Sequence, residues 1–203
     1  KPSGLLSIES DSEKTNTAYR LLTDYVQQKE KKARVFVVHR IDKDTSGVMM
    51  VSKNEELKNR LQDKWNDLVT DRKYIAICEG IFEKKQGTIK QYLKETKTNI
   101  MYNSRTPNDG QEAITHYKVI KENSKYSMVD VCIDSGRKNQ IRVHMGDLGH
   151  KVVGDDKYNS ETNPLNRLGL HAYVLEFVHP ITNKLMTFKA EIPTIFNSLF
   201  SKK

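Results

Sequence analysis

Strand-like segments dominate the sequence between residues 74 and 190, and one helical segment interrupts them. The β-compatible segments are 74–78, 88–93, 113–120, 126–133, 168–177 and 185–190. Within residues 140–148, Ile141, Met145 and Leu148 recur at helical spacing, and Gly149 stands where a helix-ending glycine belongs. Many strands with few intervening helices favour an α+β fold with a mainly antiparallel, mixed sheet.

The residues before this run contain two helical segments and two short apolar strands. Residues 17–28 have apolar side chains at helical spacing, and residues 35–38 and 48–51 are short and apolar. Asn54 is the predicted N-cap of a helix over residues 54–68. The length of 203 residues fits one globular domain, or one catalytic domain with two lobes.

The composition restricts the class of partner and the compartment. The formal net charge of +8 favours a phosphate-rich partner, although a Lys-rich surface that serves solubility alone gives the same balance. Cys78 and Cys132 lie far apart and outside any Cys-x-x-Cys pattern, so neither a disulfide framework nor a cysteine zinc site is expected. No apolar run approaches the roughly 18 residues of a membrane span. We therefore expect a soluble, cytoplasmic protein without membrane contact.

A first concentration of chemically active side chains lies between the two short strands. Residues 39–47 have the sequence His-Arg-Ile-Asp-Lys-Asp-Thr-Ser-Gly, which contains two carboxylates, two hydroxyls and three basic groups. Loops held between strands often carry catalytic groups. By composition alone, however, a solvated polar turn is the stronger interpretation.

A second concentration opens the helical segment at 140–148. Residues 135–144 have the sequence Ser-Gly-Arg-Lys-Asn-Gln-Ile-Arg-Val-His, so three cations, two amides and an imidazole surround a helix start. Such a start suits phosphate contacts, because its free backbone N–H groups and its dipole add to the side-chain charge. A solvated helix end explains the same residues equally well. The histidines lack metal-ligand spacing, so no metal site is predicted.

Together the two segments resemble the RluA family of pseudouridine synthases, which isomerise uridine in RNA. Residues 39–47 are similar to the family pattern His-Arg-Leu-Asp-x-x-Thr-Ser-Gly, and residues 136–145 are similar to its arginine helix. Further matches, in the family's order, are Lys-Pro-x-Gly at 1–4, Lys-Tyr-Ile-Ala at 73–76, Gly-His at 149–150, Gly-Asp at 154–155, Leu-His-Ala at 170–172 and His-Pro at 179–180. The resemblance covers nearly the whole chain and implies the pseudouridine synthase fold, with two lobes and a central catalytic cleft.

Two positions depart from the commoner family pattern. Ile41 replaces a Leu, which is a volume-conserving exchange. Asn139 stands where a His is commoner, and an amide cannot shuttle protons, so the position points to an Asn139 subgroup without acid–base chemistry there. The first residues resemble the end of a strand, which suggests that residues 1–203 are a catalytic domain without its natural N-terminus and without any upstream RNA-binding domain.

The resemblance implies three catalytic residues and no cofactor. Asp42 is the essential carboxylate: it attacks C6 of the uracil or C1′ of the ribose, or it removes the 2′ proton, and these alternatives stay open. Arg142 is expected to form a buried ion pair that keeps Asp42 charged and to stabilise the departing uracil anion. Tyr74 is expected to stack on the base, and its hydroxyl is a candidate for removing the C5 proton.

Four further residues are expected to contact RNA. Arg40 matches the residue that fills the space left by a flipped-out base, and Ile141 would pack beneath that base. Arg137 and Lys138, at the helix start, are phosphate candidates. The expected partner is ribosomal or transfer RNA, bound by a monomer without an obligate protein partner.

Two other functions agree with part of the pattern. An RNA-binding module without catalysis is consistent with the charge but leaves the set of Asp42, Tyr74 and Arg142 unexplained. A glycoside hydrolase needs two carboxyl groups about 5 to 9.5 Å apart across a sugar-binding cleft. Asp42 and Asp44 on one turn suit that requirement poorly, so an RNA pseudouridine synthase is the predicted function.

Overall fold

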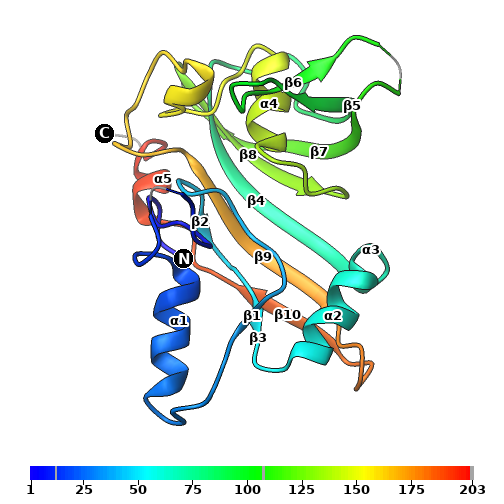
Figure 1. Cartoon of the computed structure of the whole chain (residues 1–203). Helices are drawn as coiled ribbons and strands as arrows, with labels where there is room; N and C mark the ends of the chain where they lie inside the picture. Colours follow the sequence, from blue (N-terminus) through cyan, green and yellow to red (C-terminus); the bar gives the residue numbers. More distant parts are fainter. Residues whose placement is uncertain (12, 107, 202–203) are drawn as a thin grey trace.

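One large sheet joins the two lobes of the molecule in the computed structural model, which describes residues 1–11, 13–106 and 108–201 (Figure 1). Its strand order is β10–β9–β4–β8–β7–β5–β6, and β2 pairs with β9 outside this path. The strands are β2 (Ser46–Gly47), β4 (Val69–Glu79), β5 (Gln86–Glu95), β6 (Met101–Ser104), β7 (Gln111–Glu122), β8 (Tyr126–Ile133), β9 (Leu170–Val178) and β10 (Leu185–Lys189). The pairings along the path are antiparallel and β2–β9 is parallel. The predicted α+β fold with a mainly antiparallel, mixed sheet is therefore confirmed.

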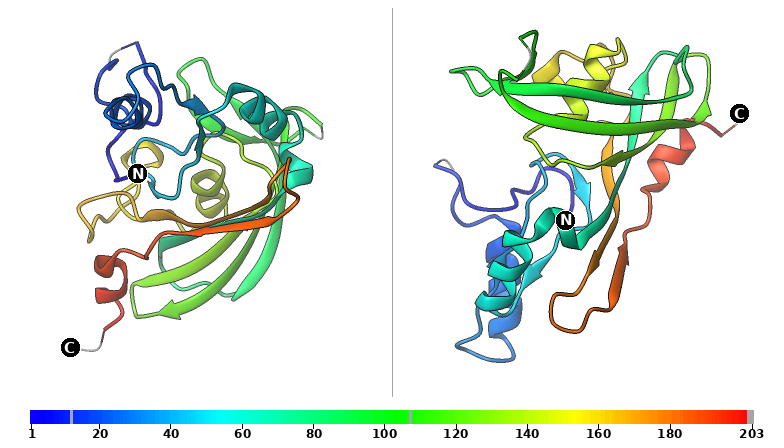
Figure 2. Two further views of the ribbon diagram at one scale, coloured as in Figure 1. Left: turned by 90° about the horizontal axis from the view of Figure 1, so that it is seen from below. Right: turned by 90° about the vertical axis from the view of Figure 1, so that its right-hand side faces the viewer.

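The helices and a small second sheet complete the two lobes. In the upper lobe, α4 (Gln140–Asp147) lies inside the curve of the large sheet, which Figure 2 shows from below. The lower lobe contains α1 (Ala18–Gln27), α2 (Glu55–Asp63), α3 (Trp65–Leu68) and a pair of short strands, β1 (Phe36–Val37) and β3 (Val51–Ser52). The last elements are the 3-10 helix η1 (Asp156–Tyr158) and α5 (Thr194–Ser198). Within the described part of the chain, none of the helices is long and apolar enough to cross a membrane.

Apolar faces hold the helices against the sheet. Ile141 and Met145 of α4 pack into a buried cluster with Ala76 of β4 and Val131 of β8. In the lower lobe a second cluster joins α2 and α3 to β9 through Leu57, Leu61, Trp65, Leu68, Leu175 and Phe177. The structure thus confirms the predicted inward-facing positions except Leu148, which follows the last residue of α4 and is exposed.

Two predicted elements differ from the observed ones. The helix expected over 54–68 begins as predicted, since Asn54 Oδ1 accepts a hydrogen bond from the backbone N–H of Leu57 at 2.8 Å. It breaks at Lys64, whose φ of −113° is not helical, and α3 follows as a separate turn that leads directly into β4. The strand expected at 48–51 is replaced by β2 and β3, because residues on either side of this stretch pair with different partners, β9 and β1. The short strand β6 was not predicted.

The contact between β2 and β9 ties residues 39–47 to the large sheet. Gly47 pairs with Ala172, and the backbone N–H of Val48 donates to the carbonyl oxygen of Ala172 at 2.8 Å. On its other side, Ala172 pairs with Tyr74 of β4. Gly47 has a φ of +119°, and a Cβ built there would lie 1.9 Å from the carbonyl oxygen of Ala172. Only glycine therefore allows β2 to approach β9 this closely.

We predict that Gly47→Ala destabilises the fold by at least about 2 kcal/mol, because the new methyl group meets fixed backbone and the residue keeps a strained φ. The matched control is Gly146→Ala in α4, where a Cβ meets nothing within 4 Å. That exchange should leave stability unchanged or raise it by about 0.5–1 kcal/mol. Urea unfolding of the two variants checks this, and equal midpoints would contradict the requirement for glycine at position 47.

Candidate active site

Asp42 lies on the loop between β1 and β2, and contacts with the lower lobe fix that loop. Ser7 Oγ donates to the carbonyl oxygen of Ile41 at 2.6 Å. His39 Nε2 accepts from the backbone N–H of Met50 at 3.0 Å, and its ring lies against Trp65 with centroids 5.1 Å apart. Burial lowers the pKa of His39 to about 4, so this imidazole is a neutral acceptor at physiological pH. His39 therefore stabilises the loop that carries Asp42.

The guanidinium of Arg142, in the upper lobe, faces two carboxylates, those of Asp155 and Asp42. Its Nε and Nη2 donate to Asp155 Oδ2 and Oδ1 at 2.7 and 2.6 Å, while Nη1 lies 3.5 Å from Asp42 Oδ2. Arg142 and Asp155 are 6% and 1% exposed, whereas the side chain of Asp42 is 29% exposed. The expected ion pair between Arg142 and Asp42 is present at 3.5 Å. It is longer than the contacts to Asp155, because the buried Asp155 matches both donors of the guanidinium edge.

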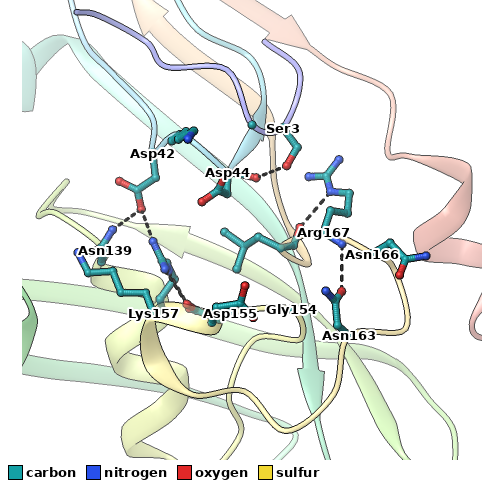
Figure 3. A pocket seen from close by; sticks show the side chains of 15 residues that line it. Ser3, Asp42, Asp44, Asn139, Gly154, Asp155, Lys157, Asn163, Asn166 and Arg167 are labelled. Carbon is teal, nitrogen blue, oxygen red and sulfur yellow. Dashed lines mark hydrogen bonds and ion pairs between the residues drawn. The ribbon is translucent and has the colours of Figure 1, made fainter. Parts of the chain in front are cut away.

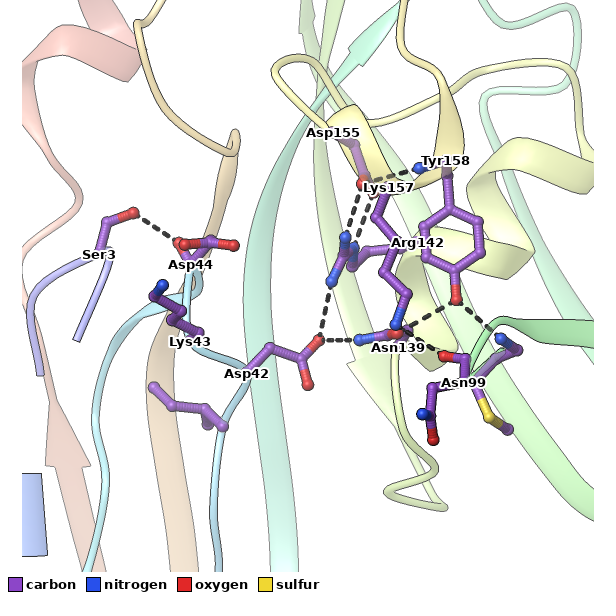
Figure 4. Close-up of polar contacts among 12 residues, drawn as sticks. Ser3, Asp42, Lys43, Asp44, Asn99, Asn139, Arg142, Asp155, Lys157 and Tyr158 are labelled. Atoms are coloured by element: carbon purple, nitrogen blue, oxygen red, sulfur yellow. Dashed lines mark hydrogen bonds and ion pairs between the residues drawn. The ribbon is translucent and has the colours of Figure 1, made fainter. Parts of the chain in front are cut away.

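Asn139 supplies the shorter hydrogen bond to Asp42. Its Nδ2 donates to Asp42 Oδ2 at 2.6 Å, and its Oδ1 accepts from the hydroxyl of Tyr158 at 3.1 Å (Figure 4). Both the amide and Arg142 thus approach the same carboxylate oxygen. Within the described residues, Oδ1 of Asp42 has no hydrogen-bond partner, so one oxygen of the carboxylate is held and the other is open.

Tyr74 lies on β4 at a bulge in the pairing with β9. The register shifts between Lys73 and Tyr74, and such bulges redirect side chains next to functional sites. Burial raises the pKa of Tyr74 to about 12, the nearby Arg72 lowers it and Asp42 raises it, so the phenol stays protonated near neutral pH.

Three hollows adjoin one another in this region, and Asp42 lines two of them. The loop hollow, about 700 Å³, lies between Asp42 and residues 154–168, with Asn163 and Arg167 on its far side (Figure 3). The central hollow, about 70 Å³, has Tyr74, Ile141 and Leu170 among its walls and also reaches Asp42. The tryptophan hollow, about 340 Å³, lies beside Trp65 and Arg72.

The central hollow brings together most of the residues that sequence analysis selected. Its lining contains Asp42, Tyr74, Arg142, Arg40, Arg137 and Ile141. Arg40 is exposed and also lines the tryptophan hollow, so it stands where these two hollows meet. Lys138 lines none of the three hollows and forms an ion pair with Glu95.

No role was predicted from the sequence for Tyr158, or for Asp155 of the matched Gly-Asp pair. Asp155 Oδ1 also accepts from the backbone N–H of Tyr158 at 3.2 Å, so it caps η1 while it binds Arg142. One signal was available: a buried arginine needs a carboxylate partner, and the Gly-Asp pair follows the arginine helix closely.

We predict that Asp155→Ala lowers the free energy of unfolding by about 3–5 kcal/mol, because it leaves the buried Arg142 guanidinium without its nearest counter-charge. Asp156→Ala is the control: its exposed side chain is adjacent in sequence, and its loss should change stability by less than about 0.5 kcal/mol. Denaturant unfolding of both variants at pH 7 measures the difference. A similar small loss for both would mean that Arg142 is adequately solvated without Asp155.

A family model described as RNA pseudouridylate synthase matches residues 1–147. The chain is also similar to curated proteins. It is 34% identical over 201 residues to the uncharacterised RNA pseudouridine synthase YhcT of Bacillus subtilis (strain 168), covering 98% of this chain and 66% of that protein. It is 34% identical over 182 residues to the ribosomal large subunit pseudouridine synthase D of Zymomonas mobilis, covering 83% and 56%. It is 30% identical over 223 residues to the tRNA pseudouridine synthase C of Haemophilus ducreyi, covering 100% and 89%. The chain thus spans only part of the length of several relatives.

A solved structure agrees with the fold. The human RNA pseudouridylate synthase domain containing 4 superposes with a TM-score of 0.76 at 22% identity, covering 97% of this chain and 85% of that one. The expected pseudouridine synthase fold is therefore confirmed. Because the family model spans most of the chain and these relatives are at least 30% identical over most of it, the chain belongs to the RNA pseudouridylate synthase family.

Proposed function

We propose that this chain isomerises uridine in ribosomal or transfer RNA to pseudouridine, with Asp42 as the catalytic residue. One observation carries this proposal: Asp42 lies where the loop hollow and the central hollow meet, with Oδ2 held by hydrogen bonds and Oδ1 open. A carboxylate in this position can attack C6 or C1′, or remove the 2′ proton, and each of these steps needs its ionised form.

The central hollow would hold the target base. Tyr74 offers an aromatic face and Ile141 an apolar one, both beside Asp42. The raised pKa of Tyr74 favours the stacking role over removal of the C5 proton, because very little phenolate is present near neutral pH. The small volume of about 70 Å³ implies that the walls separate when a base enters.

Arg142 would stabilise negative charge that develops on the uracil as the glycosidic bond breaks. Its guanidinium lines both the loop hollow and the central hollow, and Nη1 is the nitrogen that points toward Asp42. The other edge is bound to Asp155, so the cation is oriented before the substrate arrives. In this proposal the main task of Arg142 is this pre-organised charge, and its ion pair with Asp42 at 3.5 Å is secondary.

RNA would approach across the exposed rim of the hollows. Arg40 and Arg137 are exposed there, and Arg137 Nε donates to the carbonyl oxygen of Glu112 at 3.0 Å, which leaves its terminal nitrogens for phosphate. Lys138 remains a phosphate candidate only if RNA displaces Glu95. Relatives named for ribosomal and for transfer RNA are both similar to this chain, so either RNA class is a substrate candidate.

We predict that Asp42→Asn lowers turnover below about one-thousandth of wild type and leaves RNA affinity within a few-fold, because affinity comes from many phosphate contacts. Asp44→Asn removes an exposed carboxylate from the same loop and should retain activity. Pseudouridine is measured after digestion of a uridine-containing RNA, and affinity by filter binding. Full turnover by Asp42→Asn would refute the proposed chemistry, and RNA binding without any product from wild type would favour a binding module.

Arg40→Ala should lower turnover at least about tenfold more on a stably paired uridine than on the same uridine in a loose single strand. The reason is that Arg40 would fill the gap left by a flipped base, and unstacking costs a few kcal/mol only when the base starts in a helix. Lys118→Ala, which removes one exposed cation outside the three hollows, controls for lost charge and should affect both RNAs alike. An equal loss on both RNAs for Arg40→Ala would remove the base-flipping role.

A further inference from the structure

A chain of three hydrogen bonds runs from the backbone of β6 to the carboxylate of Asp42. The backbone N–H of Met101 donates to the hydroxyl oxygen of Tyr158 at 3.2 Å, and that hydroxyl donates to Asn139 Oδ1 at 3.1 Å. Asn139 Nδ2 then donates to Asp42 Oδ2 at 2.6 Å. Figure 4 shows Tyr158, Asn139 and Asp42 in this order, with Arg142 beside them.

The direction of this chain follows from the chemistry of its first and last members. A backbone N–H can only donate, so the hydroxyl of Tyr158 accepts there and is left with its own hydrogen for Asn139. The amide oxygen must then face Tyr158, and the amide nitrogen must face Asp42. If the amide were turned over, two acceptor oxygens would lie 2.6 Å apart at Asp42, which is repulsive.

The side chains of Asn139 and Tyr158 are both fixed by their surroundings. Asn139 occupies the N-cap of α4 with a left-handed φ of 52°, a conformation that Asn tolerates better than most residues, and its side chain makes no capping hydrogen bond. It therefore gives up the usual task of an N-cap Asn. The ring of Tyr158 lies 5.0 Å from the guanidinium carbon of Arg142, and Asp155 binds its backbone N–H.

We propose that Tyr158 and Asn139 act as one positioning pair that holds Asp42 by Oδ2 and so directs Oδ1 toward the ribose and base. Asn139 makes the contact, and Tyr158 acts through it by setting the orientation of the amide. The open Oδ1 is then the oxygen that reacts. This proposal rests on the proposed function, because it assigns these residues to the use of Asp42 in that reaction.

A double-mutant cycle tests the pair. Tyr158→Phe, Asn139→Ala and the double variant are compared by single-turnover rate at saturating RNA, with Tyr102→Phe on exposed β6 surface as the matched control. Each single change should lower the rate about tenfold or more, because a hydrogen bond in the path to a charged group is lost. In the Asn139→Ala background, Tyr158→Phe should cost little further, because the amide that it orients is gone. RNA affinity should stay within a few-fold, and Tyr102→Phe should match wild type.

A spectroscopic readout keeps the test independent of turnover. In protein labelled with 15N-asparagine, the Asn139 side-chain amide is assigned by its absence from Asn139→Ala. One of its protons should lie far downfield because it donates to a carboxylate, and it should move upfield in both Tyr158→Phe and Asp42→Ala.

The outcomes separate the two proposals. Additive rate losses, or an unchanged amide proton in Tyr158→Phe, overturn the positioning pair even when wild type is active and Asp42→Asn is not. If wild type forms no pseudouridine, the proposed function fails, and the amide shift alone then decides whether Tyr158 orients Asn139 toward Asp42.

Discussion

The arrangement around Asp42 depends on the buried guanidinium of Arg142. A cation at 6% exposure loses most of its hydration, and this cost must be offset by charge and hydrogen bonds of good geometry. Asp155 supplies both through two hydrogen bonds of 2.6 and 2.7 Å. Because Asp155 also caps η1, the same pair places Tyr158 and the loop that follows α4. The ion pair thus shapes the wall that faces Asp42 from the upper lobe.

The register of β9 sets the position of the Asp42 loop relative to this wall. Ala172 pairs with Gly47 on one side and with Tyr74 on the other, so one residue of the sheet sets the level of both the Asp42 loop and the candidate stacking residue. A slip by one position would turn Tyr74 to the opposite face of the sheet. The absence of a side chain at Gly47 lets β2 approach closely enough for this register to form.

Two chemically different groups contact the carboxylate of Asp42: the charged guanidinium of Arg142 and the neutral amide of Asn139. Arg142 is bound mainly by Asp155, so its charge acts on Asp42 from 3.5 Å, and the neutral amide of Asn139 makes the shorter contact. Asp155 binds Nε and Nη2, so in the proposed function Nη1 is the nitrogen left to face charge that develops on a substrate. A neutral donor, in turn, orients Asp42 without adding a titrating group beside it.

Much of the fold and the composition of the site could be predicted from the sequence. Strand periodicity predicted the α+β class, helical spacing predicted the buried face of α4, and the matched segments selected six residues that line one hollow. These features depend on local pattern or on residue type. Lys138 was selected on the same basis, yet its ammonium pairs with Glu95, which lies 43 positions away in the sequence.

The tertiary structure alone decided which groups meet. The chain by itself determined that Asp42, Asn139 and Arg142 are present and lie on a loop and at a helix start. It did not determine that Asp155 takes the guanidinium, or that Tyr158 turns the amide of Asn139 toward Asp42. Hydrogen-bond partners are chosen by distance and direction in space. Asp42 and Arg142, 100 positions apart in the sequence, meet here because the sheet register and the buried Arg142–Asp155 pair place them.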